Sequence, residues 1–405
     1  MTLTESPPAA SRWHWLPIGV FTAFAALNML DRQLLAALAP TIRAEFGLNN
    51  TTYGALSSVF AVTTAIASPL TGLLLDRIGL TLGACVAIFV WSLAGAATGF
   101  THSLRGLIAC RIGLAAGESG GGAAPGMVLA RYMDAGQRGV GAAFLFTGTS
   151  LGAIAAPLVA AALTPRFGWR AVFVICGLLG LLWIPVWAAC ARLVPPRFQK
   201  GRTQLVPIPG LLTDPRFWGT IAAYALARQT LWVSWTTLYF VDARNMTMLE
   251  ANQRFSWFPS VFGAVGAFVA GSIALFLIRR GVGGVQARLR TSWLLAPLVF
   301  LTALVPFAAS NTTAAVLIGL SFVGSVAIWT NAHVIPIDVY GVGRSAFTYA
   351  ALEGGFAGVQ MFASPAIGAA LDRYGYTAVC LMMPWLPMLG LVILTFCLWY
   401  ADRRH

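Results

Sequence analysis

The stretch Asn28-Met29-Leu30-Asp31-Arg32 sets a carboxylate beside a guanidinium within the first long apolar segment, which runs from Trp15 to Pro40. Such a pair inside an apolar helix is costly unless it faces a protein interior or a water-filled cavity. Two interpretations are open at this point. The pair is either a structural ion pair that locks helices together or part of a site that handles protons and anions.

The composition around this stretch is that of a membrane protein. Of the 405 residues, 58% are hydrophobic and only 10% are charged, and the mean hydropathy is +0.77. A soluble domain could not keep a wetted surface at that balance. The apolar runs are long and unbroken, which favours helices that span a bilayer. The net charge of +13 does not indicate nucleic acid, because the basic residues are scattered over short connections.

The apolar runs predict twelve transmembrane helices and hence an all-α membrane protein. Each run is long enough to cross a hydrocarbon core of roughly 30 Å at about 1.5 Å per residue. The predicted spans are 15–40, 52–74, 81–101, 104–131, 138–163, 170–192, 217–241, 254–278, 291–309, 313–335, 343–371 and 377–400. Because the longest polar connection follows the sixth span, we expect six-helix bundles at 15–192 and 217–400, a cytoplasmic linker at 193–216, and cytoplasmic tails at 1–14 and 401–405.

The loop arginines predict the orientation. With both termini in the cytoplasm, most of these arginines fall on the cytoplasmic side, as the positive-inside rule requires. We therefore expect a multi-pass protein of the inner cell membrane, and the start of the chain shows no pattern of a cleaved signal peptide. The six cysteines lie in apolar runs without metal or redox spacing, and we interpret them as buried small hydrophobic residues.

A repeated motif relates the two halves of the chain. The stretches 67–79 and 363–375 both follow the pattern A-S-P-x-x-G-x-x-L-D-R-x-G. One copy closes the second span on the cytoplasmic side, and the other closes the eleventh span on the outer side. Inverted repeats of three helices would produce this arrangement, so we expect the two bundles to be pseudo-symmetric.

Six ionisable groups remain inside the predicted spans once the loop residues are removed. They are Asp31, Arg32, Arg111, Glu118, Arg228 and Glu353, so three arginines face three acids. Arg111 and Glu118 lie about two helical turns apart and share one face of the fourth span. Glycines flank Glu118 and also suit a close interface between helices, so a structural role for this segment is the alternative.

Polar and aromatic side chains follow Arg228 in the seventh span and suit an anion with hydroxyl groups or a planar body. Gln229 and Trp232 are among them, and Asn331 in the tenth span could line the same cavity. An interfacial aromatic belt is the alternative for the tryptophans. His333 and Glu353 lie close to span ends, where a structural histidine and an interfacial carboxylate are expected as readily as a cavity lining.

Several short motifs occur along the chain in a set order. They are Leu30-Asp31-Arg32, Gly72-x-x-x-Asp76-Arg77-x-Gly79, Arg111 with Gly117-Glu118, Phe167-Gly168-Trp169-Arg170 and Arg279-Arg280-Gly281. In order and spacing they resemble the major facilitator superfamily, whose signature loop lies between the second and third helices. Within it they are similar to the anion:cation symporter family of bacterial hexuronate and aldonate transporters. The stretch after Arg228 departs from the sugar-acid members.

The resemblance implies two pseudo-symmetric bundles that rock about a central site, and a symporter that imports a small organic anion together with protons. The anion would be a carboxylate such as a sugar acid. By position, Asp31 and Glu118 would bind the protons, Arg32 would bind the substrate carboxylate, Arg111 would pair with Asp31, and Arg228 would be a second anion contact. We expect the substrate site to include Arg111, Gln229, Trp232 and Asn331 together with Arg32 and Arg228.

Charged residues at the cytoplasmic ends of the spans are candidates for a gate. They are Asp76, Arg77, Arg131, Asp134 and Arg138, which could pair between helices when that side closes. The alternative is that these charges only set the topology.

Other functions share parts of this pattern. A Spinster-like lipid or lysolipid transporter and a proton-driven drug antiporter are the alternatives within the same fold. We expect no enzyme, since no nucleophile and base are paired, and no metal or other cofactor, because the four histidines are scattered. The expected partners are a small organic anion, protons and the lipid bilayer, without nucleic acid, and the chain is expected to be a monomer.

Overall fold

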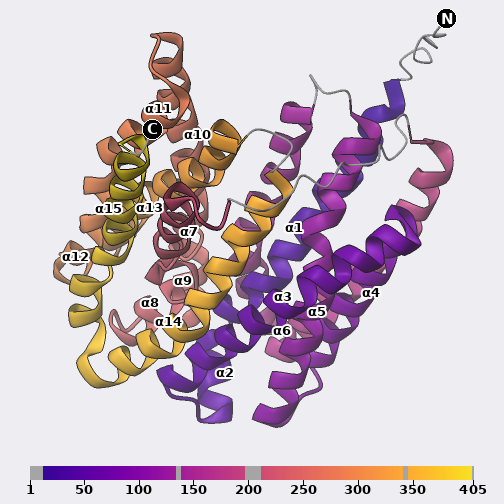
Figure 1. The fold of residues 1–405 in the computed structure, drawn as a ribbon. Coiled ribbons are helices and arrows are strands. Elements are labelled where there is room, and N and C mark those ends of the chain that lie inside the picture. Colours follow the sequence, from indigo (N-terminus) through magenta and orange to yellow (C-terminus); the bar gives the residue numbers. More distant parts are fainter. Residues whose placement is uncertain (1–11, 134–137, 197–210, 341–344, 404–405) are drawn as a thin grey trace, which may run out of the picture.

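Two bundles of helices lie side by side in the computed structural model (Figure 1). It describes residues 12–133, 138–196, 211–340 and 345–403, and these residues contain helices and connections but no strand. We call residues 12–196 the N-half and residues 211–403 the C-half. The fold is therefore all-α, as the apolar runs predict.

The N-half follows the predicted spans closely. Its helices are η1 (Arg12–Trp15), α1 (Leu16–Ala37), the short α2 (Ala39–Phe46), α3 (Asn50–Ile78), α4 (Leu80–Thr98), α5 (Leu104–Tyr132) and α6 (Arg138–Leu193). Gly168, at φ 76°, breaks α6 into two arms. At about 1.5 Å per residue a straight helix of this length would far exceed a bilayer, so the arms are separate spans.

The C-half contains more broken helices. Its elements are α7 (Pro215–Ala227), η2 (Leu231–Val233), α8 (Thr236–Asp242), α9 (Met248–Arg254), α10 (Phe258–Arg279), α11 (Gly284–Leu295), η3 (Ala296–Phe300), α12 (Leu301–Leu304), η4 (Val305–Phe307), α13 (Asn311–Tyr340), α14 (Ser345–Met382) and α15 (Trp385–Asp402). Gly375, at φ 72°, breaks α14 as Gly168 breaks α6. Both breaks need the left-handed backbone that glycine adopts at little cost.

Six of the described helices are long and apolar enough to cross a membrane, and the pair α14 and α15, which meet at 44°, supplies a seventh span of this kind. The seventh predicted span is not one continuous helix. It stops at Arg228, continues through η2 and resumes as α8. The β-branched Thr230 and Val233 in this break are weaker helix formers than straight side chains. The ninth predicted span changes between α-helix and 3-10 helix, and prolines, which lack a backbone donor, stand at the start of η3 and η4.

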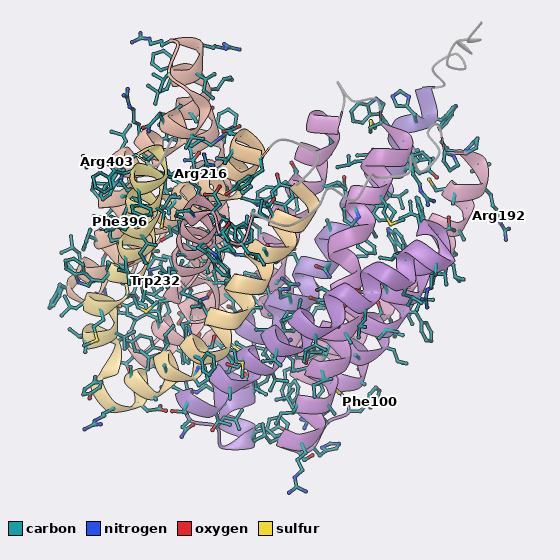
Figure 2. The ribbon with its side chains drawn as sticks, in the orientation of Figure 1. Phe100, Arg192, Arg216, Trp232, Phe396 and Arg403 are labelled. Carbon is teal, nitrogen blue, oxygen red and sulfur yellow. The ribbon has the colours of Figure 1, made fainter. Side chains whose placement is uncertain are left out.

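The labelled residues distinguish the two ends of the helix bundles. Arg192, Arg216 and Arg403 lie toward the end that holds the chain termini, whereas Phe100 lies at the opposite end (Figure 2). The short helix α2 also lies at that opposite end (Figure 1). We call it the closed end, for the contacts described next.

At the closed end the two halves are joined. Arg43 Nη1 pairs with Asp242 Oδ2 at 2.6 Å, and Asn252 Nδ2 donates to the carbonyl of Ala37 at 2.8 Å. One apolar core, which includes Leu38, Tyr53 and Trp235 from the two halves, runs through this end. Two further cores belong to the N-half alone and the C-half alone. The halves therefore share their packing at one end and keep separate interiors toward the other.

The repeated motif takes part in this closure. Asp372, from the second copy, accepts hydrogen bonds from the backbone amides of Asn50 at 3.0 Å and Thr51 at 2.9 Å. These are the first free amides of α3, where a negative charge is stabilised by the helix dipole. The carboxylate of one half thus caps a helix of the other half. The chain reaches this closeness because Gly368 on α14 faces the Asn50 carbonyl without a side chain.

A cluster within the N-half holds the end of α2. Trp169 Nε1 donates to Glu45 Oε2 at 2.5 Å, and Arg170 Nη2 pairs with Glu45 Oε1 at 2.5 Å. Arg170 also donates to the carbonyl of Thr101. The hydrogen bonds from Arg170 and then Trp169 hold the pKa of Glu45 below its usual range. The Phe167-Gly168-Trp169-Arg170 motif is therefore a structural clamp at the closed end.

Replacing Asp372 by Ala should loosen the start of α3. Each lost hydrogen bond is worth about 1 kcal/mol, so the amides of Asn50 and Thr51 should exchange with deuterium roughly five times faster. The matched control is Asp76→Ala, which changes the corresponding residue of the first copy of the motif at the other end of α3. Equal exchange of these two amides in wild type and Asp372→Ala would show that the cap does not stabilise the closed end.

Candidate functional site

An ion pair in the N-half joins α1 to α5. Arg32 donates from Nε at 3.0 Å and from Nη2 at 2.9 Å to Oε2 of Glu118. The Glu118 side chain is completely buried, whereas the Arg32 side chain is 36% exposed. Oε1 of Glu118 is also buried and accepts no hydrogen bond from the described residues. The cation of this pair is therefore reachable from outside, and its anion is not.

Asp31 and Arg111 are buried close to this pair. Asp31 Oδ2 and Arg111 Nε have no hydrogen-bond partner among the described residues. The expected pairing of Arg111 with Asp31 is not what the structure has, because no ion pair joins Arg111 to an acid in the described part of the chain. Instead, Arg32 donates to Glu118. The Arg111 guanidinium packs against an aromatic ring.

That ring is Phe60, on α3. The guanidinium carbon of Arg32 lies 4.9 Å from the ring centroid, and that of Arg111 lies 5.2 Å from it. An aromatic ring attracts cations to its π-system, with roughly 0.5 to 2 kcal/mol for each. Phe60 therefore holds two guanidinium groups of like charge within one cluster.

A second ion pair lies in the C-half. Arg228, at the end of α7, donates from Nη1 to Glu353 Oε1 at 2.8 Å and Oε2 at 3.0 Å. Arg228 Nη1 is also hydrogen-bonded to the Tyr224 hydroxyl at 2.5 Å, and that hydroxyl donates to Glu353 Oε1. The Phe356 ring covers the guanidinium at 4.0 Å. The Glu353 side chain is 57% exposed, so here the acid is the reachable partner.

The two ion pairs, Arg32 with Glu118 and Arg228 with Glu353, interact electrostatically. Arg32 of the N-half is near enough to Glu353 of the C-half to act on its charge, and His333 on α13 does so too. His333 also packs edge-on against the rings of Tyr224 and Tyr349. The two ion pairs are therefore linked electrostatically across the two halves.

The other three expected substrate contacts have partners inside the C-half. Gln229 Nε2 donates to the Ala225 carbonyl at 3.4 Å, and Asn331 Nδ2 donates to Ser292 Oγ at 3.2 Å. Trp232 Nε1 donates to Thr302 Oγ1 at 3.1 Å, and Figure 2 shows this residue within the C-half bundle. All three side chains are buried. Their contact with substrate stays a prediction.

The expected gate is described only in part. Asp134 lies outside the described residues, as do the side chains of Asp76 and Arg138. Arg77 is exposed at the end of α3, and Arg131 is half-buried in the last turn of α5. A gate at this end stays a prediction.

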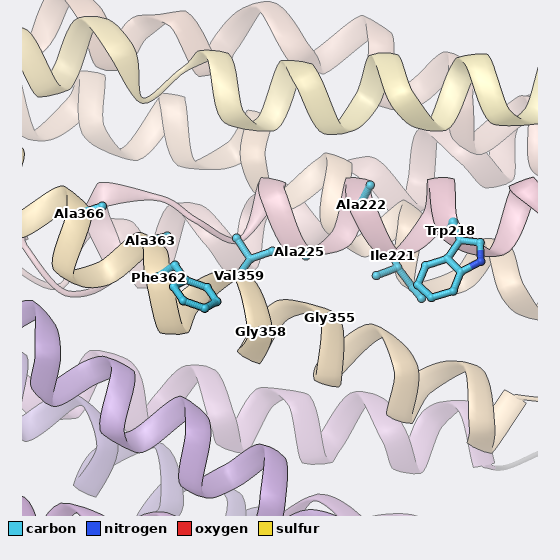
Figure 3. Close-up of a pocket in the computed structure, with 10 residues that line it drawn as sticks. All are labelled: Trp218, Ile221, Ala222, Ala225, Gly355, Gly358, Val359, Phe362, Ala363 and Ala366. Atoms are coloured by element: carbon cyan, nitrogen blue, oxygen red, sulfur yellow. The ribbon is translucent and has the colours of Figure 1, made fainter. Parts of the chain in front are cut away.

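An apolar cavity of about 650 Å³ lies between α7 and α14 (Figure 3). Its lining includes Ile221, Gly358 and Phe362 and carries no charged side chain. It begins close to the second ion pair, because Ala225 and Gly355 line it and are near neighbours of Arg228 and Glu353 in the chain. Among the described residues no group of three or more His, Cys, Asp or Glu side chains could hold a metal ion.

Sequence reasoning identified the six charges but not their pairing. It left open whether Glu353 is interfacial or lines the cavity, and the structure makes Glu353 the partner of Arg228. Equal numbers of arginines and acids at depth were the signal for ion pairs, and two of the three arginines do pair with an acid among the described residues. Tyr224 and Phe60 were missed altogether, because an aromatic residue in an apolar helix carries no local mark of contact with a cation.

Helices of this length around buried charge pairs define a multi-pass membrane transporter. The profile described as Major Facilitator Superfamily matches residues 21–351, and the chain belongs to this superfamily. A structure of a bacterial homolog to the human lysosomal transporter Spinster, in inward-facing and unoccupied conformation, superposes with a TM-score of 0.74. The two share 19% identity over 97% of this chain and 96% of that one, so they share the fold.

Curated relatives agree with the resemblance seen in the motifs. The chain is 28% identical over 324 residues to a probable L-galactonate transporter of Escherichia coli, which covers 73% of this chain and 70% of the relative. It is 24% identical over 386 residues to a probable sulfoacetate transporter of Cupriavidus necator, which covers 88% of this chain and 87% of the relative. The chain is thus similar to transporters of the hexuronate and aldonate type.

Replacing Arg32 by Ala should destabilise the protein more at pH 8 than at pH 5. Without Arg32 the buried Glu118 carboxylate loses its cation, at a cost of roughly 1 to 3 kcal/mol when it is charged. Below the pH at which Glu118 takes up a proton this cost disappears, so the deficit in melting temperature should shrink as the pH falls.

The measurement is thermal unfolding of the purified protein in detergent at both pH values. Arg43→Ala is the control, since it breaks an ion pair whose acid reaches water, and its deficit should be equal at the two pH values. An equal deficit for Arg32→Ala at pH 5 and pH 8 would contradict the assignment of a charged, buried Glu118.

Proposed function

We propose that this chain is a proton-coupled symporter that imports a small organic anion, a carboxylate such as a sugar acid, by alternating access. The relatives support an anionic substrate, since they are named as transporters of L-galactonate and sulfoacetate. The observation that carries the proposal is the asymmetry of the first ion pair. A reachable Arg32 is held by a Glu118 that no solvent reaches.

Coupling follows from competition for Arg32. A substrate carboxylate binds a guanidinium through charge-assisted hydrogen bonds and so competes with Glu118 for the same donors. Once displaced, Glu118 is a buried carboxylate with no direct cation partner. Such a group takes up a proton rather than stay charged. Anion and proton therefore bind together, and release of the anion returns Arg32 to Glu118 and frees the proton.

A second proton is supplied by Asp31. It is buried beside Arg32, and its Oδ2 atom lacks a hydrogen-bond partner in the described structure. One positive charge moved across the membrane gains roughly 2.3 kcal/mol per 100 mV. A monoanion carried with one proton gains nothing from the potential, whereas with two protons it carries one positive charge inward. Asp31 and Glu118 together make electrogenic uptake feasible.

The orientation determines which state the structure represents. With both termini in the cytoplasm, the closed end faces outward, and the separate interiors of the halves face the cytoplasm. The state is then inward-facing. Substrate would leave past Arg32 and Glu353 toward the cytoplasm, and the contacts of Asp372 and Arg43 would have to break before the outward-facing state could form.

The test is uptake into proteoliposomes with an imposed proton gradient, with L-galactonate and sulfoacetate as probes. Glu118→Gln and Asp31→Asn each replace a titrating acid by a neutral group of the same shape. Both variants should lose accumulation against a gradient by at least about ten-fold, because the proton-dependent step is gone. Exchange of labelled for unlabelled anion, which needs no net proton movement, should remain.

Glu250→Gln is the matched control, since Glu250 lies in a capping box at the start of α9 away from both ion pairs. Its accumulation should equal that of wild type. Full accumulation by both the Glu118 and the Asp31 variants would reject proton coupling through these acids.

Transport of an amphipathic lipid is the second candidate. The observation that favours it is the apolar cavity between α7 and α14, where the Phe362 side chain is 71% exposed. A carboxylate or phosphate head group at Arg228 would leave an acyl chain beside this cavity. Thermal-shift titrations separate the two, because a ligand that binds only the folded protein raises its melting temperature. Stabilisation by lysolipid but not by small carboxylates would favour the lipid.

A further inference from the structure

Arg228 already holds a carboxylate from its own chain. The two oxygens of Glu353 lie 2.8 and 3.0 Å from Nη1 of Arg228, and the Tyr224 hydroxyl donates to the first of them. Two donors from α7 thus converge on one carboxylate from α14. A free carboxylate would be bound by the same donors in the same way.

The surroundings of this pair favour exchange of the anion rather than of the cation. Phe356 covers the Arg228 guanidinium at 4.0 Å and Tyr224 lies against it at 5.1 Å, so the cation is fixed by the bundle. Glu353, by contrast, is 57% exposed and has a flexible side chain. It can leave Arg228 and remain in contact with solvent, whereas Glu118 cannot.

We propose that Glu353 is a tethered counter-anion, which occupies in the empty transporter the position that an anionic group of the substrate takes at Arg228 and Tyr224. This inference rests on the proposed transport of anions and adds a specificity-determining residue to it. The ligand class is a carboxylate or sulfonate, because Nη1 of Arg228 reaches two oxygens of one group and the Tyr224 hydroxyl reaches one of them.

The tether has a consequence for selectivity. A carboxylate linked to the same chain acts at an effective concentration on the order of millimolar or higher. A simple monocarboxylate makes the same contacts with Arg228 as the Glu353 carboxylate does. Because Glu353 is tethered, it outcompetes such an anion. An anion that also engages Arg32 of the N-half gains contacts that Glu353 cannot supply. Glu353 therefore admits anions that bridge the halves and rejects those that bind only one.

The charged and titratable groups that face Glu353 come from three other elements. They are Arg228 and Tyr224 on α7, His333 on α13 and Arg32 on α1. Since the arginines favour the ionised carboxylate and solvent can reach it after displacement, Glu353 can move away without taking up a proton. Its role is thus distinct from that of Glu118.

The experiment measures how well acetate shields Arg228. Purified protein is labelled with phenylglyoxal, an arginine reagent, and the fraction of modified Arg228 is read by peptide mass spectrometry. In Glu353→Gln, Arg228 should be labelled faster than in wild type in the absence of acetate. The acetate concentration that halves the labelling should fall at least about five-fold, because the internal competitor is gone.

Two references make the result specific. Arg288, paired with Asp338 at 2.6 Å, is read in the same digest and should not change. Glu250→Gln makes the same chemical change at α9 and should behave as wild type. If Glu353→Gln does not fold, Glu353→Asp retains the charge but shortens the reach, and it should lower the half-protecting acetate concentration by a smaller factor.

The proposal is overturned if acetate protects Arg228 at the same or a higher concentration in the folded Glu353 variant than in wild type, or does not protect it at all. Glu353 would then be a structural partner or a direct substrate contact. Because labelling needs no gradient and no transport, this failure is separate from a failure of proton coupling, which is read from accumulation by the Asp31 and Glu118 variants.

Discussion

The salt bridge between Arg32 and Glu118 places a fully buried anion against a half-reachable cation, and the rest of the site is arranged around that imbalance. A buried carboxylate is tolerated only while a cation neutralises it or a proton does. Whatever draws Arg32 away must therefore be matched by a proton on Glu118. The second pair, between Arg228 and Glu353, has the opposite imbalance, with a fixed cation and a reachable anion. In the proposed mechanism, the first pair couples anion binding to proton uptake, and the second lets an anion exchange without a proton.

The proposed alternating access requires that the contacts between the halves at the closed end can break and re-form. The closed end joins the halves through a shared apolar core that contains more buried residues than either of the separate cores. Polar contacts also cross this end, such as the cap of Asp372 on α3 and the pairing of Arg43 with Asp242. Interactions of this kind are worth only about 1 kcal/mol each, so a modest change in binding energy can reverse them.

Much of the fold and many of the charges were predictable from sequence, because both depend on local pattern. Long apolar runs mark spans, and charged residues inside them stand out, so Asp31, Arg32, Arg111, Glu118, Arg228 and Glu353 were all found. Their pairing was not predictable, since it depends on how α1, α5, α7 and α14 are rotated about their axes. The break after Arg228 was also missed. The apolar character of Trp232 and Trp235 favoured a continuous span, while the departure from helix comes from the local backbone and tertiary contacts.

Phe60 has a further consequence for how substitutions in this region would be tolerated. Two like charges approach one ring, whose negative π-surface attracts both and, unlike water, does not need to reorient. An aliphatic residue of similar volume would fill the same space yet leave the guanidinium groups to repel each other directly. Only aromatic substitutions of Phe60 should therefore be tolerated. Hydrophobicity alone does not distinguish Phe60 from its neighbours in this apolar helix.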